Sequence, residues 1–377
     1  MITSTTSGVW ESDDIYKKLN AGYLTYQETG YLFVWGYGNF GQLGLNDTVS
    51  RSSPVQVPGS QWNNISTGDR ASLATKQDGT LWSWGLPDYG QLGINDRAYR
   101  SSPVQIPGTA WNTVSSGYRA SFATKTDGTL WSWGYNTYGT LAINSTAHRS
   151  SPTQIAGTQW EPSTLKAGLY GIIITKTDNT LWVNGINHHG QLGQNNRTYY
   201  SSPIQVPGTQ WTKGDKEVYS SSAIKSDGTL WTWGQNQAGE LGQNDLASRS
   251  SPVQIPGTQW SDISWGSYNI FAKKTDGTLW AWGINPYGNL GQNNTTYYSS
   301  PVQIPGTQWD KISGSRDASF ASKTDGTIWG FGSNAQGQLG QNDTINHSSP
   351  IQIPGTQWNK IEGSMFSYNV AATKYAP

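Results

Sequence analysis

The sequence predicts an all-β protein, a seven-bladed β-propeller, from three observations. First, the stretch Asp78–Gly85 (DGTLWSWG) returns almost unchanged at Asp127–Gly134, Asp227–Gly234 and Asp276–Gly283. Second, the glycines that close this stretch and its looser copies follow each other at spacings of 49, 49, 51, 49, 49 and 49 residues, so seven units fill the chain. Third, no unit shows helical periodicity. A repeat of this length indicates a solenoid, a propeller or an array, and a closed ring removes exposed sheet edges.

One unit, residues 53–101, shows how each blade is expected to form. The alternating stretch 54–57 predicts a strand that ends at the turn signal Pro58-Gly59. A second strand is expected around 71–76, and Asp78-Gly79 supplies a tight hairpin because glycine tolerates positive φ. The strand 80–84 follows. Four short strands of this kind make one propeller blade.

The two ends of the repeat region indicate how the ring closes. The last unit reaches residues 371–374 and stops before its Leu-Trp-Ser-Trp-Gly strand, whereas residues 31–36 form such a strand without a blade of their own. We therefore expect the N-terminal strand to complete the seventh blade. This register divides the chain into an extension, residues 1–30, and a propeller, residues 31–377.

The extension contains a predicted short helical segment. Ser12 is a suitable N-cap and Gly22 a plausible end, and Ile15 and Leu19 fall on one face. The pattern around Trp10, Ile15 and Tyr16 resembles terminal segments of tailed-phage virion proteins. The segment is interpreted either as a docking peptide, with Trp10, Ile15, Tyr16 and Leu19 as contact residues, or as a plug on one face of the ring.

Composition excludes several classes of function. Charged residues make up 13% of the chain, about half the usual share, and the formal net charge is zero, so no basic stripe is available for nucleic acid. The chain has no cysteine for disulfides or thiolate metal sites. No apolar run is long enough to insert in a membrane, and no secretory signal is visible.

No residues form a recognisable catalytic set, so the sequence predicts a non-enzymatic protein without a cofactor or metal. His188 and His189 are adjacent, but no carboxylate or cysteine stands at a supporting spacing. The Asn-Asp pairs, such as 46–47 and 95–96, predict Asx turns and not calcium sites. A lysine recurs beside each hairpin, and a solvated rim is favoured over an anion site there. The seven are Lys76, Lys125, Lys176, Lys225, Lys274, Lys323 and Lys374.

Candidate contact residues lie in the polar loops between blades and at tryptophans outside the repeat. Tyrosine and arginine are enriched in interface hot spots. The loop set comprises Tyr99, Arg100, Arg149, Tyr199, Tyr200, Arg249, Tyr297 and Tyr298, and Trp265 is the candidate tryptophan within the propeller.

The units resemble the regulator-of-chromosome-condensation repeat, because Trp-Gly is followed by Gly-Gln-Leu-Gly at residues 41–44, 90–93, 190–193 and 337–340. This resemblance implies a seven-bladed propeller. It does not transfer the family's exchange-factor activity, since no wedge insertion interrupts the chain and the only length change is two residues between Trp160 and Gly185. It also does not transfer a photoreceptor role, because Gly68-Asp69-Arg70-Ala71 lacks the tryptophan and histidine of that subfamily.

The sequence thus favours a structural protein of a bacteriophage virion, a capsid decoration or a tail component, present in many copies. Its expected partners are other virion proteins or a host-surface receptor, and its expected location is the particle. The alternative is a cytoplasmic scaffold or GTPase-regulator-like propeller that binds a protein partner. A second alternative is a carbohydrate-binding adhesin.

Overall fold

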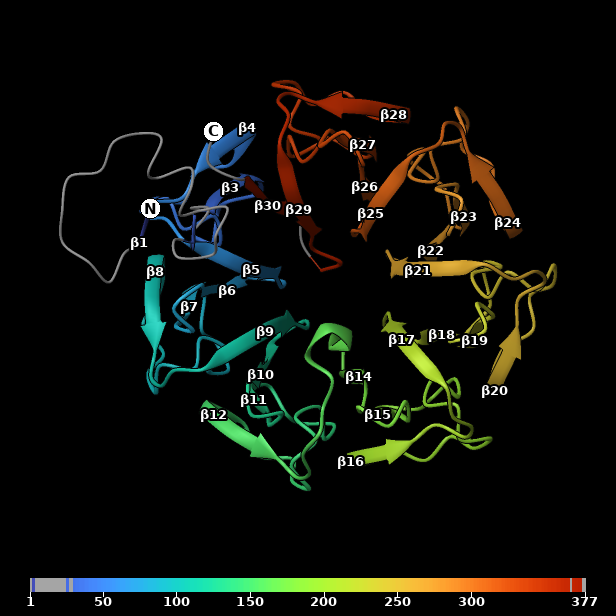
Figure 1. Cartoon of the computed structure of the whole chain (residues 1–377), viewed down its shortest axis with the longest axis horizontal. Coiled ribbons are helices and arrows are strands. Elements are labelled where there is room, and N and C mark those ends of the chain that lie inside the picture. The colour runs from blue at the N-terminus through green and yellow to red at the C-terminus, as the bar shows by residue number, and fades with distance from the viewer. Residues whose placement is uncertain (1, 4–24, 27–29, 367, 375–377) are drawn as a thin grey trace.

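A computed structural model describes residues 2–3, 25–26, 30–366 and 368–374. Seven four-stranded antiparallel sheets stand around a central axis, with the first strand of each blade innermost (Figure 1). The predicted seven-bladed all-β propeller is confirmed. The predicted helical segment of the extension lies outside the described residues, as do Trp10, Ile15, Tyr16 and Leu19.

The strands occupy four positions in each blade. The innermost are β5 (Trp62–Thr67), β9 (Trp111–Ser116), β13 (Lys166–Gly168), β17 (Trp211–Lys216), β21 (Trp260–Trp265), β25 (Trp309–Gly314) and β29 (Trp358–Gly363). The second are β6 (Ala71–Lys76), β10 (Ala120–Lys125), β14 (Gly171–Thr175), β18 (Ser220–Lys225), β22 (Asn269–Lys274), β26 (Ala318–Lys323) and β30 (Asn369–Lys374).

The third are β7 (Leu81–Gly85), β11 (Leu130–Gly134), β15 (Leu181–Gly185), β19 (Leu230–Gly234), β23 (Leu279–Gly283), β27 (Ile328–Gly332) and β3 (Tyr31–Gly36). The outermost are β8 (Arg100–Ile106), β12 (Arg149–Ile155), β16 (Tyr200–Gln205), β20 (Arg249–Gln254), β24 (Tyr298–Ile304), β28 (His347–Ile353) and β4 (Arg51–Gln56). A 3₁₀ turn, η1 (Pro162–Thr164), precedes β13, and β1 (Ile2–Thr3) pairs with β2 (Thr25–Tyr26).

The ring closes as predicted. In the seventh blade the strand order is β29-β30-β3-β4, so the third strand comes from the N-terminal part of the chain. β3 pairs with β30 from Tyr31 opposite Lys374 to Gly36 opposite Asn369. Leu32, Val34 and Trp35 of β3 are fully or almost fully buried. Closure therefore rests on both ladder hydrogen bonds and apolar burial.

The repeated Asp-Gly forms the hairpin between the second and third strands. Gly79 has a φ of 76°, which a side chain would strain. Thr80 donates its N–H and its hydroxyl to Asp78 Oδ1 at 2.9 and 2.7 Å, and Trp82 Nε1 donates to Thr80 Oγ1 at 2.9 Å. The face of the ring that carries these hairpins is called the hairpin face, and the opposite face the loop face.

Neighbouring blades are joined by the second repeated tryptophan. Trp84 is fully buried, and its Nε1 donates to the carbonyl oxygen of Gln42 in the preceding blade at 2.9 Å. Gly44, with φ +69°, is required here because a Cβ would come within 2.8 Å of Trp84 Nε1. The Gly-Gln-Leu-Gly turn is thus the acceptor and the seat for the next blade's indole.

The Asx turns predicted at the Asn-Asp pairs are confirmed. Asn46 has a φ of 63°, and Val49 donates its N–H to Asp47 Oδ1 at 3.0 Å. The same Asx contact recurs at Asp96, Asp245 and Asp343.

Candidate functional site

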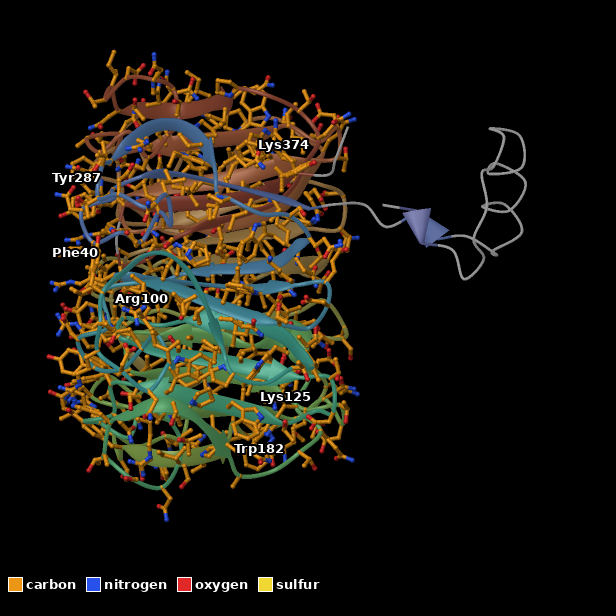
Figure 2. The ribbon with its side chains drawn as sticks, turned by 90° about the vertical axis from the view of Figure 1, so that its left-hand side faces the viewer. Phe40, Arg100, Lys125, Trp182, Tyr287 and Lys374 are labelled. Carbon is orange, nitrogen blue, oxygen red and sulfur yellow. The ribbon has the colours of Figure 1, made fainter. Side chains whose placement is uncertain are left out.

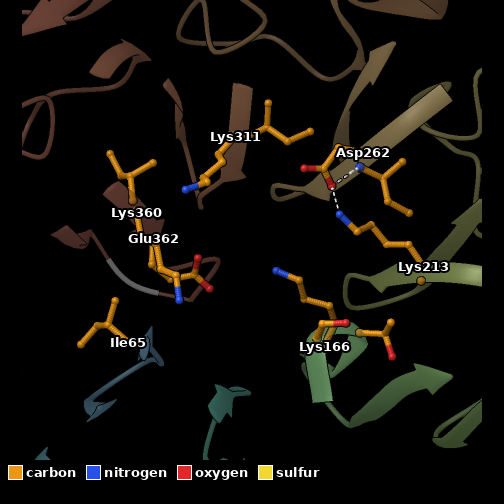
Figure 3. Close-up of a pocket in the computed structure, with 13 residues that line it drawn as sticks. Ile65, Lys166, Lys213, Asp262, Lys311, Lys360 and Glu362 are labelled. Atoms are coloured by element: carbon orange, nitrogen blue, oxygen red, sulfur yellow. Dashed lines mark hydrogen bonds and ion pairs between the residues drawn. The ribbon is translucent and has the colours of Figure 1, made fainter. Parts of the chain in front are cut away.

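The innermost strands enclose a central channel whose charged residues break the repeat. Other blades carry Asn64, Thr113, Ser66 and Ser115 at the channel-facing positions. A cavity of about 280 Å³ lies among the inner strands. Six ionisable side chains line it: Lys166, Lys213, Lys311, Lys360, Asp262 and Glu362 (Figure 3).

Three of the four lysines have defined acceptors. Lys213 Nζ forms an ion pair with Asp262 at 2.6 Å. Lys311 Nζ donates to the backbone oxygen of Asn359 at 2.5 Å. Lys360 Nζ donates to the side-chain oxygen of Asn64 in the neighbouring blade. Only Lys213 is therefore neutralised by a carboxylate at contact distance.

The fourth lysine, Lys166, follows η1 in the blade with the two-residue insertion. Its ammonium group points into the cavity, and the Glu362 carboxylate lies across from it (Figure 3). Burial opposes the charged form of Lys166, but Glu362, Asp215 and Asp262 outweigh that effect and raise its pKa above the ordinary value. Burial raises the pKa of Glu362, although Lys166 and Lys360 act in the opposite direction.

The segment Ser364–Phe366 crosses the end of the channel toward the loop face. Ser364 Oγ donates to the Gly68 oxygen at 2.9 Å, and the Phe366 ring packs edge-on against Tyr118 at 6.0 Å between centroids. The cavity beside this segment measures only about 30 Å³, roughly the share of one water in the liquid. The channel is thus a recess that narrows sharply toward the loop face.

Three further buried ionisable groups lie at the end of β17 and directly after it. Asp215 accepts the backbone N–H groups of Lys216 and Trp265 at 2.8 and 3.1 Å, and burial raises its pKa to about 6. Lys216 Nζ donates to the Asn184 oxygen at 3.3 Å, and burial lowers the pKa of Lys216 to about 7. Burial also raises the pKa of Glu217 to about 7.

Asn184 explains why a lysine fits between these blades. It stands where five other blades carry the second tryptophan, and its Nδ2 donates to the oxygens of Gly139 and Thr140 at 2.8 and 3.0 Å. This contact reproduces the link between blades that Trp84 makes elsewhere, with a much smaller side chain. Asn184 in place of a tryptophan and the large side chain of Lys216 between the same blades are therefore complementary in volume.

The loop face carries a group of packed rings that spans three blades, here called the aromatic cluster. It consists of Tyr89, Tyr135, Tyr138, Tyr170 and His148. Ring centroids lie 5.1 Å apart for Tyr89–Tyr135, Tyr135–His148 and Tyr138–Tyr170.

Arg119 borders the aromatic cluster. Its guanidinium lies 5.0 Å from the Tyr89 ring centroid, and Nη1 donates to the Tyr89 hydroxyl at 3.0 Å. Tyr138 is 40% exposed and His148 is also exposed. Figure 2 shows that the loop-face residues Phe40 and Tyr287 lie at one side of the ring and Lys125 and Lys374 toward the other. The aromatic cluster was not predicted from the sequence. Tyr138 and Tyr170 stand at positions that are also tyrosine in other blades, such as Tyr287 and Tyr268, so the repeat gives little signal for the cluster.

The predicted loop residues are distributed around the ring and do not form one patch. They lie beside the outermost strands of five successive blades, β8 to β24. Tyr99, Tyr199 and Tyr297 are exposed. Tyr200 is half-buried against a core cluster, and Tyr298 accepts a hydrogen bond from Asn294 at 3.0 Å.

The predicted arginines have local roles. Arg100 pairs with Asp96 at 2.8 Å and Arg249 with Asp245 at 2.6 Å, whereas Arg149 donates to the His148 oxygen. The interpretation of Trp265 as a contact residue is wrong. Trp265 is fully buried, and its Nε1 donates to Ser222 Oγ at 2.8 Å, so it fills space between blades.

The recurring lysines have a structural role that the sequence analysis did not predict. Lys125 Nζ lies 4.7 and 4.8 Å from the ring centroids of Trp111 and Trp131. The same lysine–tryptophan cage repeats at Lys76, Lys176, Lys225, Lys274 and Lys323. In the seventh blade Lys374 lies over Phe33 and Trp358.

Grooves between blades adjoin two of these cages. One, of about 290 Å³, is lined by Trp211, Trp231, Lys225 and two prolines, Pro207 and Pro252. The next, of about 320 Å³, has the same lining from Trp260, Trp280 and Lys274.

His188 and His189 do not share a site with carboxylates. His188 contacts the Tyr199 hydroxyl, and His189 packs on Tyr219 at 4.9 Å between centroids. Burial lowers the pKa of His189, with smaller effects from His188 and Arg197. Within the described ranges, no three His, Cys, Asp or Glu side chains gather as a metal site would require. In the same part of the chain, no helix has the length and apolar character needed to cross a bilayer.

Comparison with known proteins places the chain in a family. The regulator of chromosome condensation (RCC1) repeat matches residues 29–75, 78–124, 127–163, 227–272, 276–321 and 325–364. These ranges cover well over half of the chain, which therefore belongs to the RCC1 repeat family. Residues 164–226, which contain Lys166, Asn184, Lys213 and Lys216, fall outside the matched ranges.

Solved structures share the fold at low identity. The human protein WBSCR16 superposes with a TM-score of 0.81 at 18% identity, covering 93% of this chain and 99% of that one. Yeast RCC1 (Prp20), solved bound to Kap60, gives 0.82 at 17% identity over 93% and 90% of the two chains. Prp20p from Saccharomyces cerevisiae, described with its binding properties to Gsp1p and histones, gives 0.82 at 17% over 98% and 96%. No curated protein matches the sequence.

Proposed function

We propose that this RCC1-repeat propeller is a non-enzymatic platform that binds a protein partner on its loop face, through the aromatic cluster and Arg119. The carrying observation is the continuity of Tyr89, Tyr135, Tyr138, Tyr170 and His148 across three blades. Aromatic side chains and arginine supply large contact area at low entropic cost, and they dominate interface hot spots.

The geometry favours a preformed contact surface. Arg119 is held by the Tyr89 hydroxyl and by two rings, Tyr89 and Tyr118, so its orientation is defined before a partner arrives. Tyr138 and His148 remain exposed at the edge of the aromatic cluster. Binding to such a surface pays little for ordering side chains.

Protein binding also agrees with the relatives, since yeast RCC1 is solved bound to Kap60 and Prp20p is described with Gsp1p and histones. These relatives favour a cellular partner, the setting of a scaffold or a GTPase regulator. The virion setting, with another virion protein or a host receptor as the partner, depends on the pattern at residues 8–16, outside the described part. Proteomics of purified phage particles separates the two: stoichiometric recovery supports the virion, and absence from clean particles supports the cell.

The contact surface is tested by comparing variants of the full chain. Partners captured by the wild type are expected to be lost with the double variant Tyr138→Ala and His148→Ala, because truncating hot-spot residues costs ~2 kcal/mol or more, about thirtyfold in Kd. Tyr297→Ala is the matched control, since Tyr297 is 54% exposed and lies outside the aromatic cluster. Equal retention or equal loss in the two variants would contradict this surface.

The grooves between blades favour a second candidate, carbohydrate binding. Trp231 and Trp280 each offer a half-buried ring beside prolines and a caged lysine. Aromatic faces with few polar groups suit the apolar face of a sugar. Glycan-array binding that disappears with Trp231→Ala would support this function, whereas a blank array would exclude it for the glycans printed.

A further inference from the structure

We infer that the central channel is a binding site for a small dianion with oxygen acceptors, of the size of phosphate or a short dicarboxylate, held by Lys166, Lys311 and Lys360. This inference does not depend on the proposed partner surface, because the channel recess opens away from the loop face. Its evidence is the charge and the shape of the cavity and the variation of the lining residues from blade to blade.

The lining has an excess of positive charge. Four ammonium groups face two carboxylates in a cavity of about 280 Å³, and the Asp215 carboxylate in the narrow part leaves a formal excess of one positive charge. The Lys213–Asp262 pair is internally neutral at 2.6 Å. Lys311 and Lys360 instead donate to the neutral oxygens of Asn359 and Asn64, so their charges remain available.

The lysines also lie close enough to repel each other. Burial, followed by the like charge of Lys311, lowers the pKa of Lys360. An anion between these two groups would relieve the repulsion and accept their remaining hydrogens. Lysine is well suited to this task, because its ammonium binds phosphate-like groups as a point charge.

The shape limits the ligand to a small solute. The segment Ser364–Phe366 narrows the loop-face end to a space of about 30 Å³, enough for a single water. A ligand must therefore enter from the hairpin face and stop at Lys166 and Glu362. Asp215 lies in the narrow part, where its oxygens accept two backbone N–H groups.

The charged lining residues occupy two positions of the inner strand whose residue type varies from blade to blade. At the second of these positions four blades carry a serine that accepts a backbone N–H from the next blade: Ser66, Ser115, Ser264 and Ser313. An uncharged serine at this position is therefore sufficient to link one blade to the next. Four half-buried lysines are unnecessary for closure, and partly desolvating them costs free energy.

Calorimetric titration of the intact chain with inorganic phosphate, and separately with succinate, tests the site. One saturable site is expected for at least one of the two anions in the millimolar range. Lys166→Gln and Lys360→Gln should each weaken binding about tenfold through loss of a charged hydrogen bond. Glu362→Gln should tighten binding, because it removes the opposing carboxylate.

Lys273→Gln is the matched control, with the same change of charge on β22 outside the cavity lining. Its binding constant should equal that of the wild type. The inference fails if neither anion binds, if Lys273→Gln weakens binding as much as Lys166→Gln, or if Glu362→Gln weakens it. Circular dichroism of each variant confirms that the propeller is folded, and the relative response to phosphate and succinate identifies the class of anion.

Discussion

The hairpin face and the central channel lie a few residues apart along every inner strand, yet they differ completely in regularity. At the start of the strand, a tryptophan and a lysine cage recur in nearly identical form, with ammonium-to-ring distances of 4.7–4.9 Å in six blades. Two to four residues later the channel positions vary from serine to lysine or glutamate. Repetition thus identifies what holds the ring together, and departure from it identifies what is left for recognition.

The largest expected effect on stability comes from removing the closing strand β3. Deleting residues 1–36 takes Leu32, Val34 and Trp35 out of the core, leaves β4 without a partner strand and leaves β30 paired only with β29. We expect a loss on the order of 5 kcal/mol or more in the free energy of unfolding. Deleting residues 1–22 is the control, and it should leave thermal unfolding unchanged. Equal melting temperatures for the two deletions would contradict closure by β3.

An effect of intermediate size on the free energy of unfolding is expected at Lys216, a buried charged residue at the end of an inner strand. Lys216→Met should stabilise the protein by about 1–4 kcal/mol, as apolar replacements of buried charges often do. Burial lowers the folded-state pKa of Lys216 to about 7 from 10.5, so the unfolded chain binds more protons between these values and stability rises with pH across that window. The gain from Lys216→Met should therefore be larger at about pH 6 than at about pH 9. Chemical denaturation at both pH values measures it, and a gain that grows with pH would refute the assignment.

The smallest effect is expected in a single cage. Lys125→Met keeps the apolar stem but removes the cation over Trp111 and Trp131, which should cost ~0.5–2 kcal/mol. Lys225→Met should cost the same, because its cage has the same geometry. Denaturant midpoints measure both. Clearly unequal costs would show that the cages are not equivalent.

Most of the fold could be predicted because its determinants are local and repeated. Asp78-Gly79 specifies a hairpin by its own backbone chemistry, and the missing strand at the end of the chain matched residues 31–36 by register alone. Trp265 could not be placed in this way. Its burial depends on Ser222 in the adjoining blade, a pairing that no sequence spacing indicates.

The sites were harder to predict for the same reason. Lys166 is far in sequence from Lys360 and Glu362, and it meets them only because the ring brings β13 and β29 to one axis. The signal was present, however, as charged residues at positions that hold serine or asparagine in other blades. The aromatic cluster likewise required knowledge of which loops adjoin across blades.

The pairing of β3 with β30 also determines how the ring responds to a mechanical load. The two strands are antiparallel, and Tyr31 and Lys374 face each other at the end from which both chain termini continue. A pull that separates the termini would open the ladder one residue pair at a time from that end, as a zipper opens. If residues 1–30 tether the propeller to a larger body, tension on the tether acts first on the Tyr31–Lys374 pair, and the ring's resistance to force is set there and not by its core.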